Sequence, residues 1–397
     1  MNRYFQMLVW CTRPDDDPRS AAGAPVRRPP LPASGVDWAH LERLAAHHGC
    51  LPRLRRRLGE ASPDAMPPEV SHRMLRTAQA HAFKNALREQ RALDIQDLLA
   101  ENGVSAMIFK GPALAAIAYE HPDDRVYDDL DVLVRPTDYP KARGTLCRAG
   151  YRPRVRLADR FAVAHMRAGW DCLMDSPDGR DMVELSTGVA PRHDVRSPGQ
   201  ELWDASRTVK LSDGTVHTPA SEVLLPLLCV HAAKHEWRRL AWLRDMAGLV
   251  VREKESLDWD RVLELACYYR CRRRLRIGLR LLQKLWDVNL PERIRAFLDT
   301  DRAVEPLAAV AMRRLREDAA RFPSLRSRLR FQWQQRDGLI ERCRYVSLWA
   351  LTPSFGDWQV IRLPRALFFL YYLIRPPRLL LRASKVAIRR FSRARPH

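Results

Sequence analysis

The sequence predicts an α+β fold, in which a small mixed β-sheet core is flanked by N-terminal helices and by a larger, all-helical C-terminal region. Two observations support this prediction. Short apolar runs alternate with turns and helices between residues 104 and 215, whereas apolar residues on either side recur at helical spacing. The length of 397 residues and the apolar content of 46% are typical of a globular chain with two or three domains.

The chain before the core is predicted to be helical after a loose start. Residues 1–36 are expected to form a loose N-terminal segment, because residues 13–36 mix Pro, Arg, Ala and acidic residues without a period. Residues 37–103 form the predicted N-terminal helical region. Its long helix is expected to begin near Pro68 and to end before Gly103.

Residues 104–215 form the predicted α/β core. Four apolar or alternating runs predict strands, at 104–109, 129–134, 169–175 and 180–189. The turn KGP separates the first run from a short helix, and Pro112 suits the first helical position because its missing N–H costs nothing there. The sequence SPDG between the last two runs predicts a hairpin.

The rest of the chain divides into a helical domain, residues 216–360, and a basic amphipathic tail, residues 361–397. The tail carries ten Arg or Lys residues and no Asp or Glu, with the apolar run ALFFLYYLI at 366–374. Three interpretations are open. We favour a helix docked on the core by its aromatic residues; the others are weak contact with an anionic membrane and contact with nucleic acid.

The charge balance favours a polyanionic partner. The formal net charge is +21, from 68 basic and 47 acidic residues. Such an excess is typical of proteins that bind nucleotide phosphates, nucleic acid or anionic membranes. The alternative is an Arg-rich surface with no partner.

The expected location is the cytoplasm, with contact to the inner membrane as a peripheral option. The eight cysteines form no CxxC pair, which argues against a metal cluster or a disulfide framework. The N-terminus lacks the pattern of a signal peptide. No uncharged run reaches the roughly 20 residues that a membrane-spanning helix needs.

Three aspartates lie in the otherwise strand-like sequence RVYDDLDVLV, residues 125–134. Side chains two apart on a strand share a face, so Asp129 and Asp131 project together while the apolar residues between and after them face a core. Two adjacent carboxylates repel, and their pKa values rise unless a cation lies between them. Mg²⁺ prefers such hard oxygen ligands and is commonly shared between carboxylates and substrate phosphates.

Glu184 is the predicted third carboxylate. It is the lone acid among apolar neighbours in the run 180–189, and its side chain is expected on the face opposite to theirs. The alternative for the aspartates is a solvated strand edge, or ion pairs with Arg125 and Arg135.

The order of these motifs resembles the nucleotidyltransferase superfamily of DNA polymerase beta type, and within it the bacterial branch of uncharacterised nucleotidyltransferases. The superfamily pattern is an apolar strand, a Gly turn, a helix, an Asp-x-Asp strand and a later acidic strand. It reads here as MIFKGPALAAIAY, RVYDDLDVLV and MVELS. The branch's own signature is similar to ten residues of this chain, taken in order: Lys110, Gly111, Tyr119, Arg125, Asp129, Asp131, His231, His235, Trp242 and Asp245.

The resemblance implies a metal-dependent enzyme that moves a nucleoside monophosphate from an NTP to an acceptor and releases pyrophosphate. It implies that Asp129, Asp131 and Glu184 are the catalytic residues and hold two Mg²⁺ ions, with Glu184 as ligand or base. The acceptor stays open between a small molecule, a peptide, a protein and RNA.

Five residues are expected to bind the nucleotide: Lys110, Gly111, Arg125, Lys234 and His235. The Gly turn at Gly111 lets the backbone approach phosphates closely, and Lys110 and Arg125 would pair with triphosphate oxygens. The alternative for Lys110 and Arg125 is a surface charge or an ion pair with Asp128. The alternative for the HAAKH helix, residues 231–235, is a helix–helix contact that involves Asp245. Trp237 and Trp242 are expected in the core.

The sequence departs from the superfamily pattern at two positions, and one of these departures, like the basic tail, favours another function. Pro112 follows Gly111 where relatives have Gly or Ser, which removes a backbone donor, and Ser186 stands where relatives often carry His. The first departure favours a non-catalytic protein that binds a nucleotide or a partner. The basic tail favours a third class, a peripheral membrane accessory protein of a biosynthetic operon.

Overall fold

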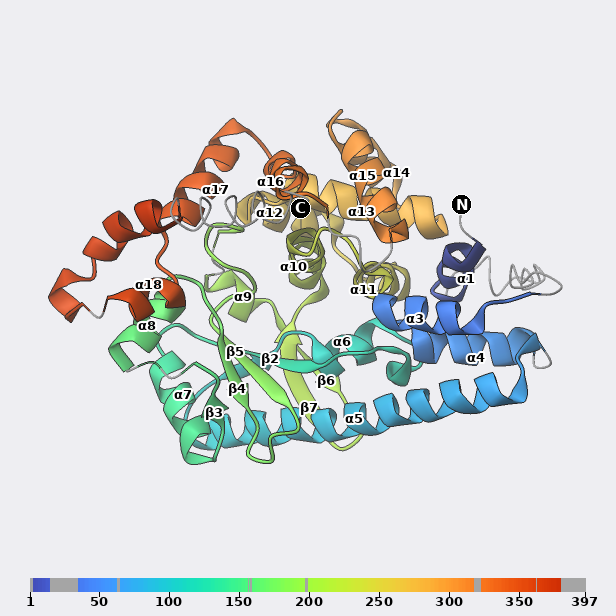
Figure 1. Cartoon of the computed structure of the whole chain (residues 1–397), viewed down its shortest axis with the longest axis horizontal. Coiled ribbons are helices and arrows are strands. Elements are labelled where there is room, and N and C mark those ends of the chain that lie inside the picture. Colours follow the sequence, from blue (N-terminus) through green and yellow to red (C-terminus); the bar gives the residue numbers. More distant parts are fainter. Residues whose placement is uncertain are drawn as a thin grey trace, which may run out of the picture.

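A five-stranded mixed sheet lies at the centre of the fold, with helices before and after it in sequence (Figure 1). The computed structural model describes residues 3–14, 35–62, 65–155, 157, 159–196, 199–317, 323–361 and 363–379. The predicted α+β class, with N-terminal helices and a larger C-terminal helical region around a small mixed sheet, is confirmed.

The central sheet has the strand order β1-β2-β5-β4-β3. Its strands are β1 (Ala106–Ile108), β2 (Asp129–Val134), β3 (Arg152–Pro153), β4 (Cys172–Asp175) and β5 (Met182–Ser186). β2 and β5 run parallel and the other pairs are antiparallel. The four predicted strands are therefore present. β2 has the predicted bounds, β1, β4 and β5 are shorter than predicted, and β3 adds an edge that the sequence did not indicate.

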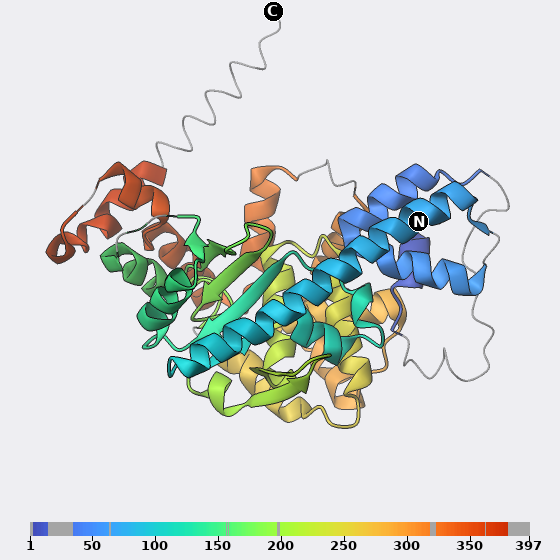
Figure 2. The ribbon, with the colours of Figure 1, turned by 90° about the horizontal axis from the view of Figure 1, so that it is seen from below.

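The N-terminal helices are α3 (Trp38–His48), α4 (Leu51–Ala61) and α5 (Pro68–Glu101). α5 begins at the predicted residue and ends two residues before Gly103, whose φ of 63° ends helical geometry there. This helix runs beneath the sheet region from the N-terminal helices to the neighbourhood of α7 (Figures 1 and 2). It thus forms a floor under the acidic strand β2.

The prediction of a loose segment over residues 1–36 is wrong for its beginning. Arg3–Cys11 form helix α1, which buries Phe5 and Leu8 against α3 and α4. The apolar run in RYFQMLVWC stabilises this helix by burial, at about 1.5–3 kcal/mol for each fully buried large side chain. Residues 15–34 of the predicted segment lie outside the described residues.

Five short helical elements also lie in the described part of the core region. They are α6 (Gly111–Ala118), η2 (Pro122–Asp124), α7 (Tyr139–Arg148), α8 (Asp159–Arg167) and α9 (Glu201–Asp204). β6 (Ser206–Lys210) and β7 (Thr215–Pro219) form a separate hairpin that packs on β1 and α6. The boundary predicted between residues 215 and 216 falls inside β7, so the helical region begins after Ala220 instead.

The C-terminal region is helical, as predicted. Its helices are α10 (Ser221–Lys234), α11 (Leu240–Arg252), α12 (Trp259–Tyr268), α13 (Arg272–Trp286), α14 (Glu292–Asp299), α15 (Val304–Arg316), α16 (Leu325–Gln334), α17 (Leu339–Leu351) and α18 (Phe355–Val360). α11 packs directly on α6, and α10 packs on α11, α12 and α13. The helical region and the sheet therefore share one hydrophobic core.

The described part of the tail is a docked helix, the interpretation that the sequence favoured. A 3-10 turn, η3 (Arg365–Leu367), precedes helical residues 370–379. Tyr371 is buried with Trp358 and Phe161 in a small cluster of its own, away from the main core. Residues 380–397 lie outside the described residues. No helix in the described ranges has the length and hydropathy needed to cross a membrane.

Part of the Arg excess has a structural role. Arg53 of α4 is buried and pairs with Asp124 at 3.0 Å, and Arg88 of α5 pairs with Asp181 at 2.9 Å. Buried guanidinium groups need such partners because an unpaired charge is costly to bury. These pairs account for some of the 68 basic residues, but they leave the net charge of +21 unchanged because each also contains an acidic residue.

Candidate active site

Asp129 and Asp131 lie at the start of β2 on one face of the sheet. The residues that alternate with them, Leu130 and Val132, are fully buried on the opposite face, as the period-2 pattern predicts. Asp131 is buried, and Asp129 is half-buried. Burial, and then the carboxylate of Asp131, raise the pKa of Asp129. Two carboxylates in this position therefore need a cation.

Glu184 lies beside Asp131, as the third-acid prediction requires. β5 pairs with β2 so that Glu184 is the register partner of Asp131. Glu184 has a second acidic neighbour that the sequence prediction missed, Asp171, which precedes β4. Burial and the nearby carboxylates of Asp171 and Asp131 raise the pKa of Glu184 to about 9. Ser186, in the position where relatives often carry His, donates to the Asp171 Oδ1 at 2.7 Å.

Lys110 supplies a cation to these acids. Its Nζ lies 2.9 Å from the Asp131 Oδ1, not against Asp128 as one alternative proposed. Burial alone would lower the pKa of Lys110, but the carboxylates of Asp131, Asp129 and Glu184 outweigh this and raise it. Lys110 is therefore charged at neutral pH and partly neutralises the acidic face.

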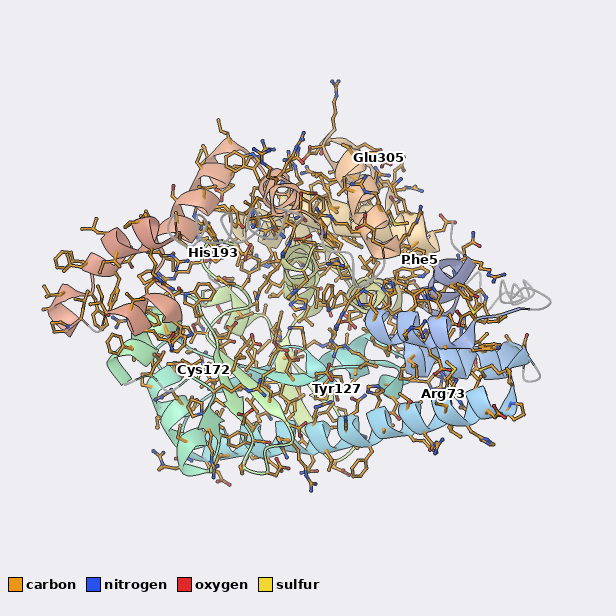
Figure 3. The ribbon with its side chains drawn as sticks, viewed as in Figure 1. Phe5, Arg73, Tyr127, Cys172, His193 and Glu305 are labelled. Carbon is orange, nitrogen blue, oxygen red and sulfur yellow. The ribbon has the colours of Figure 1, made fainter. Side chains whose placement is uncertain are left out.

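Gly111 begins α6 directly after this lysine. Its φ of 52° lies in the left-handed region, which favours glycine. Its packing neighbours are Leu130 and Tyr127, and Tyr127, labelled in Figure 3, also donates to a carbonyl of α5. The Gly turn thus fixes the start of α6 above the acidic strand. Pro112 is the second residue of α6, one place after the first helical position that was predicted for it.

Arg125 is held by Asp245 of α11 instead of facing solvent. Its Nε donates to the Asp245 Oδ1 at 2.9 Å, a second nitrogen donates to Oδ2 at 3.0 Å, and a third contact reaches the Gly111 carbonyl. The Tyr119 hydroxyl donates to the same carboxylate at 2.8 Å. Burial opposes the charge of Arg125, but Asp245 outweighs it and raises the pKa of Arg125. Four residues of the sequence signature, Gly111, Tyr119, Arg125 and Asp245, therefore form one buried network.

A cavity of about 390 Å³ lies between the sheet and the helices. Its floor holds Lys110, Gly111, Asp129 and Asp131, and Asp128 also lines it although the strand pattern points it away. α5, the turn between α3 and α4, and α10 and α11 supply the other walls. The cavity therefore brings together the sheet, the N-terminal helices and the C-terminal helical region.

Two histidines and a tryptophan form the helical wall. The ring centroids of His231 and His235 are 4.8 Å apart, and both lie within 5.5 Å of Trp242. Burial, and then nearby cations, lower the pKa of His231 well below its usual value and that of His235 to about 4. Both imidazoles are neutral at pH 7. Trp237 is buried as expected, and Trp242 packs against the main core and also lines the cavity.

The cavity gathers most of the predicted binding residues but not all. Lys110, Gly111, Arg125 and His235 line it. Lys234 is exposed on α10 and does not line the cavity. Glu184 lies on β5, the strand next to β2, and does not line the cavity.

Sequence reasoning missed two further cavity residues. Arg239 begins the wall at the N-terminus of α11, and His81 projects from α5. Arg239 has no hydrogen bond or ion pair among the side chains that the structure describes, and its guanidinium lies 5.7 Å from the Trp242 ring. The signal for Arg239 was its place three residues before Trp242, next to the HAAKHEW motif.

The acidic pair suits a hard cation. Burial, and then the carboxylate of Asp131, raise the pKa of Asp129, and paired carboxylates at a strand end are the donors that Mg²⁺ shares with phosphates. In the described ranges, however, no three His, Cys, Asp or Glu side chains are grouped for a metal ion. The predicted set of Asp129, Asp131 and Glu184 is therefore not preformed, because Lys110 contacts Asp131 and Glu184 faces Asp171.

The family comparison agrees with this architecture. Residues 34–287, which include the N-terminal helices, the sheet and α10 to α13, match the family described as uncharacterised nucleotidyltransferase. The chain belongs to this family. Searches of the curated proteins and of the solved structures find no match. As a member of the uncharacterised nucleotidyltransferase family, the protein has a general role in nucleotidyl transfer.

Proposed function

We propose that this nucleotidyltransferase moves a nucleoside monophosphate from an NTP to an acceptor hydroxyl and releases pyrophosphate. The observation that carries the proposal is the cavity in which Asp129 and Asp131 face Lys110, Gly111 and the unpaired Arg239. Carboxylates for a metal ion and cations for phosphates thus share one concave site.

Three groups of this chain would bind the nucleotide. Lys110 and Arg239 offer positive charge to the triphosphate, and the Gly111 turn brings the start of α6 close to it. Trp242 offers an aromatic wall for the base. Arg125 acts as a positioning residue, because its contacts with Asp245 and the Gly111 carbonyl fix the turn.

Asp129 and Asp131 would hold Mg²⁺ together with the phosphates. The ion, when bound, supplies positive charge to the α-phosphate and the leaving pyrophosphate. The acceptor oxygen forms a bond to the α-phosphorus while the bond from that phosphorus to the bridging oxygen breaks, and pyrophosphate leaves with the electron pair. Glu184, beside Asp131, would take the hydroxyl proton once bound Mg²⁺ offsets the neighbouring carboxylates, which together with burial raise the pKa of Glu184 to about 9.

The direct test follows the α-phosphate. The protein is incubated with Mg²⁺, NTPs labelled at the α-phosphate and fractionated small-molecule, peptide and RNA acceptors, and labelled products are counted. We expect transfer by the native chain and loss of at least 100-fold in the Asp129→Asn/Asp131→Asn variant. Asp213→Asn, on the exposed turn between β6 and β7, is the matched control. Equal transfer by the native chain and the Asp129→Asn/Asp131→Asn variant refutes the assigned site.

A second candidate is nucleotide binding without turnover. The contact between Lys110 and Asp131 favours it, because an ammonium group already satisfies part of the acidic pair. Calorimetry separates the two functions. Tight NTP binding with no pyrophosphate released for any acceptor supports binding alone.

A third candidate is peripheral contact with an anionic membrane through the tail. Phe369, Tyr372 and Leu373 are 60%, 51% and 68% exposed, next to a run of basic residues. Apolar anchors flanked by Arg suit anionic lipid. Sedimentation with anionic vesicles should carry down the native chain but not the Phe369→Ser/Leu373→Ser variant. We also propose that the protein is located in the cytoplasm, either free or in peripheral contact with the membrane through this tail.

A further inference from the structure

A second cavity, of about 500 Å³, lies beyond the far end of the acidic face. The chain segments that follow β2 and β5, the segment before β4 and the end of α8 enclose it. Its polar and aromatic lining includes Thr137, Arg167, Trp170, Asp171 and Arg192. None of these residues belongs to the nucleotide cavity.

The cavity contains two arginines, and both are exposed residues. Arg167 ends α8, and Arg192 follows β5. Among the described side chains, neither guanidinium has a hydrogen bond or an ion pair, unlike the buried Arg53, Arg88 and Arg125. Asp171 is the one acidic residue in the lining, so the cavity carries a net positive charge.

The walls that hold these groups are fixed by close packing. Gly169 has a φ of 83°, and a Cβ there would lie 2.8 Å from the Arg192 backbone nitrogen. The Arg344 guanidinium donates to the Arg192 carbonyl at 3.1 Å. The Trp170 indole donates to the Pro353 carbonyl at 3.0 Å, and its ring lies 5.8 Å from that of His193, which is labelled in Figure 3. The arginine backbone and the aromatic wall are therefore preorganised.

A row of acidic side chains joins the two cavities. Asp131 lines the first cavity, Glu184 is its register partner on β5, and Asp171 lines the second cavity in contact with Glu184. These residues lie on three neighbouring strands or strand ends. With about 4.8 Å between strands, the row spans roughly 10 Å, the reach of a small sugar phosphate.

We propose that the second cavity binds the acceptor, and that the acceptor is a small hydroxyl-bearing anion. Its phosphate or carboxylate group pairs with Arg167 and Arg192, and its hydroxyl faces Glu184 and the α-phosphate. This inference rests on the proposed function and names its acceptor class. The hydroxyl loses its proton to the chain, forms the new bond to phosphorus, and pyrophosphate leaves.

Calorimetry with defined probes tests the anion site without any turnover. The full chain is titrated with glucose 6-phosphate, gluconate and glucose, which share hydroxyl groups and differ in the anionic group. We expect at least one of the two anions to bind at least tenfold more tightly than glucose. The Arg167→Gln/Arg192→Gln variant should lose at least tenfold in affinity for that anion, whereas Arg180→Gln, an exposed charge on the β4–β5 turn, should not.

Saturating NTP locates the bound anion. Binding that persists with NTP present supports a separate cavity, whereas displacement of the anion by NTP places it in the nucleotide cavity and overturns the inference. Equal affinity in the native chain and the double arginine variant also overturns it. If NTP itself fails to bind while the arginine-dependent anion binding remains, the proposed function fails and the anion site stands.

Discussion

The Arg125–Asp245 pair gives the sharpest stability prediction. Both side chains are buried, with exposed fractions of 6% and 3%, and two hydrogen bonds join them at 2.9 and 3.0 Å. Asp245→Ala leaves the Arg125 charge buried without a partner, which costs about 3–5 kcal/mol. The Tyr119 hydroxyl loses its acceptor as well, at about 1 kcal/mol.

Urea unfolding followed by tryptophan fluorescence measures this cost. We expect Asp245→Ala to lower the free energy of unfolding by about 4 kcal/mol, and the Arg125→Met/Asp245→Leu variant to lower it by much less, because no unpaired charge stays buried. Asp213→Ala should change it by no more than about 0.5 kcal/mol. The reasoning fails if Asp245→Ala costs less than about 1 kcal/mol, or if the double variant costs as much as the two single variants together.

Three further predictions concern protonation, the Gly turn and the nucleotide. Burial lowers the pKa of His48 to about 3, so the unfolded chain binds the proton first. His48 should therefore contribute a fall in stability of about 2 kcal/mol between pH 7 and pH 5, measured in urea titrations as the difference between the native chain and His48→Gln, and an equal pH dependence of the two would contradict this. Gly111→Ala should destabilise by about 1–2 kcal/mol because φ is 52°, whereas Gly59→Ala in α4 should stabilise slightly; equal effects would refute the strain argument. Arg239→Gln should weaken NTP binding by about tenfold in calorimetry, with Arg180→Gln as control, and no change would remove Arg239 from the site.

The local part of the site could be predicted from the sequence. Side chains alternate between the two faces of a strand, so Asp129 and Asp131 must share one face whatever the rest of the fold is. By the same alternation, Glu184 lies on the opposite face from its apolar neighbours in the strand. The register that sets Glu184 beside Asp131 follows from burying both apolar faces on the same side. Local alternation thus determined most of the acidic row.

The partners of these residues depend on long-range packing. Arg125 and Asp245 are 120 positions apart, and only the docking of α11 on α6 makes them a pair. Without that contact, Arg125 is indistinguishable in sequence from a cation free to bind phosphate. Asp171 was missed for a related reason, because it precedes β4 and its approach to Glu184 depends on the hairpin register.

The N-terminal helix shows a different kind of miss. The apolar residues Phe5 and Leu8 in α1 are three apart and carry a helical signal. The Pro- and Arg-rich stretch that follows, residues 13–36, has no hydrophobic period. The prediction of a loose segment from that stretch was applied to residues 1–36 as a whole, and the helix was therefore missed. Burial against α3 and α4 stabilises a helix too short to be stable alone.

The most direct test of the central claim, that Asp129 and Asp131 hold a metal ion together with NTP, needs no knowledge of the acceptor. Mn²⁺ can replace Mg²⁺ and be counted by the electron paramagnetic resonance signal of the free ion. The account predicts that the native chain removes Mn²⁺ from solution when NTP is present, and that Asp131→Asn, checked for native circular dichroism, reduces this binding at least tenfold. Equal Mn²⁺ uptake by the native chain and by Asp131→Asn would contradict the account.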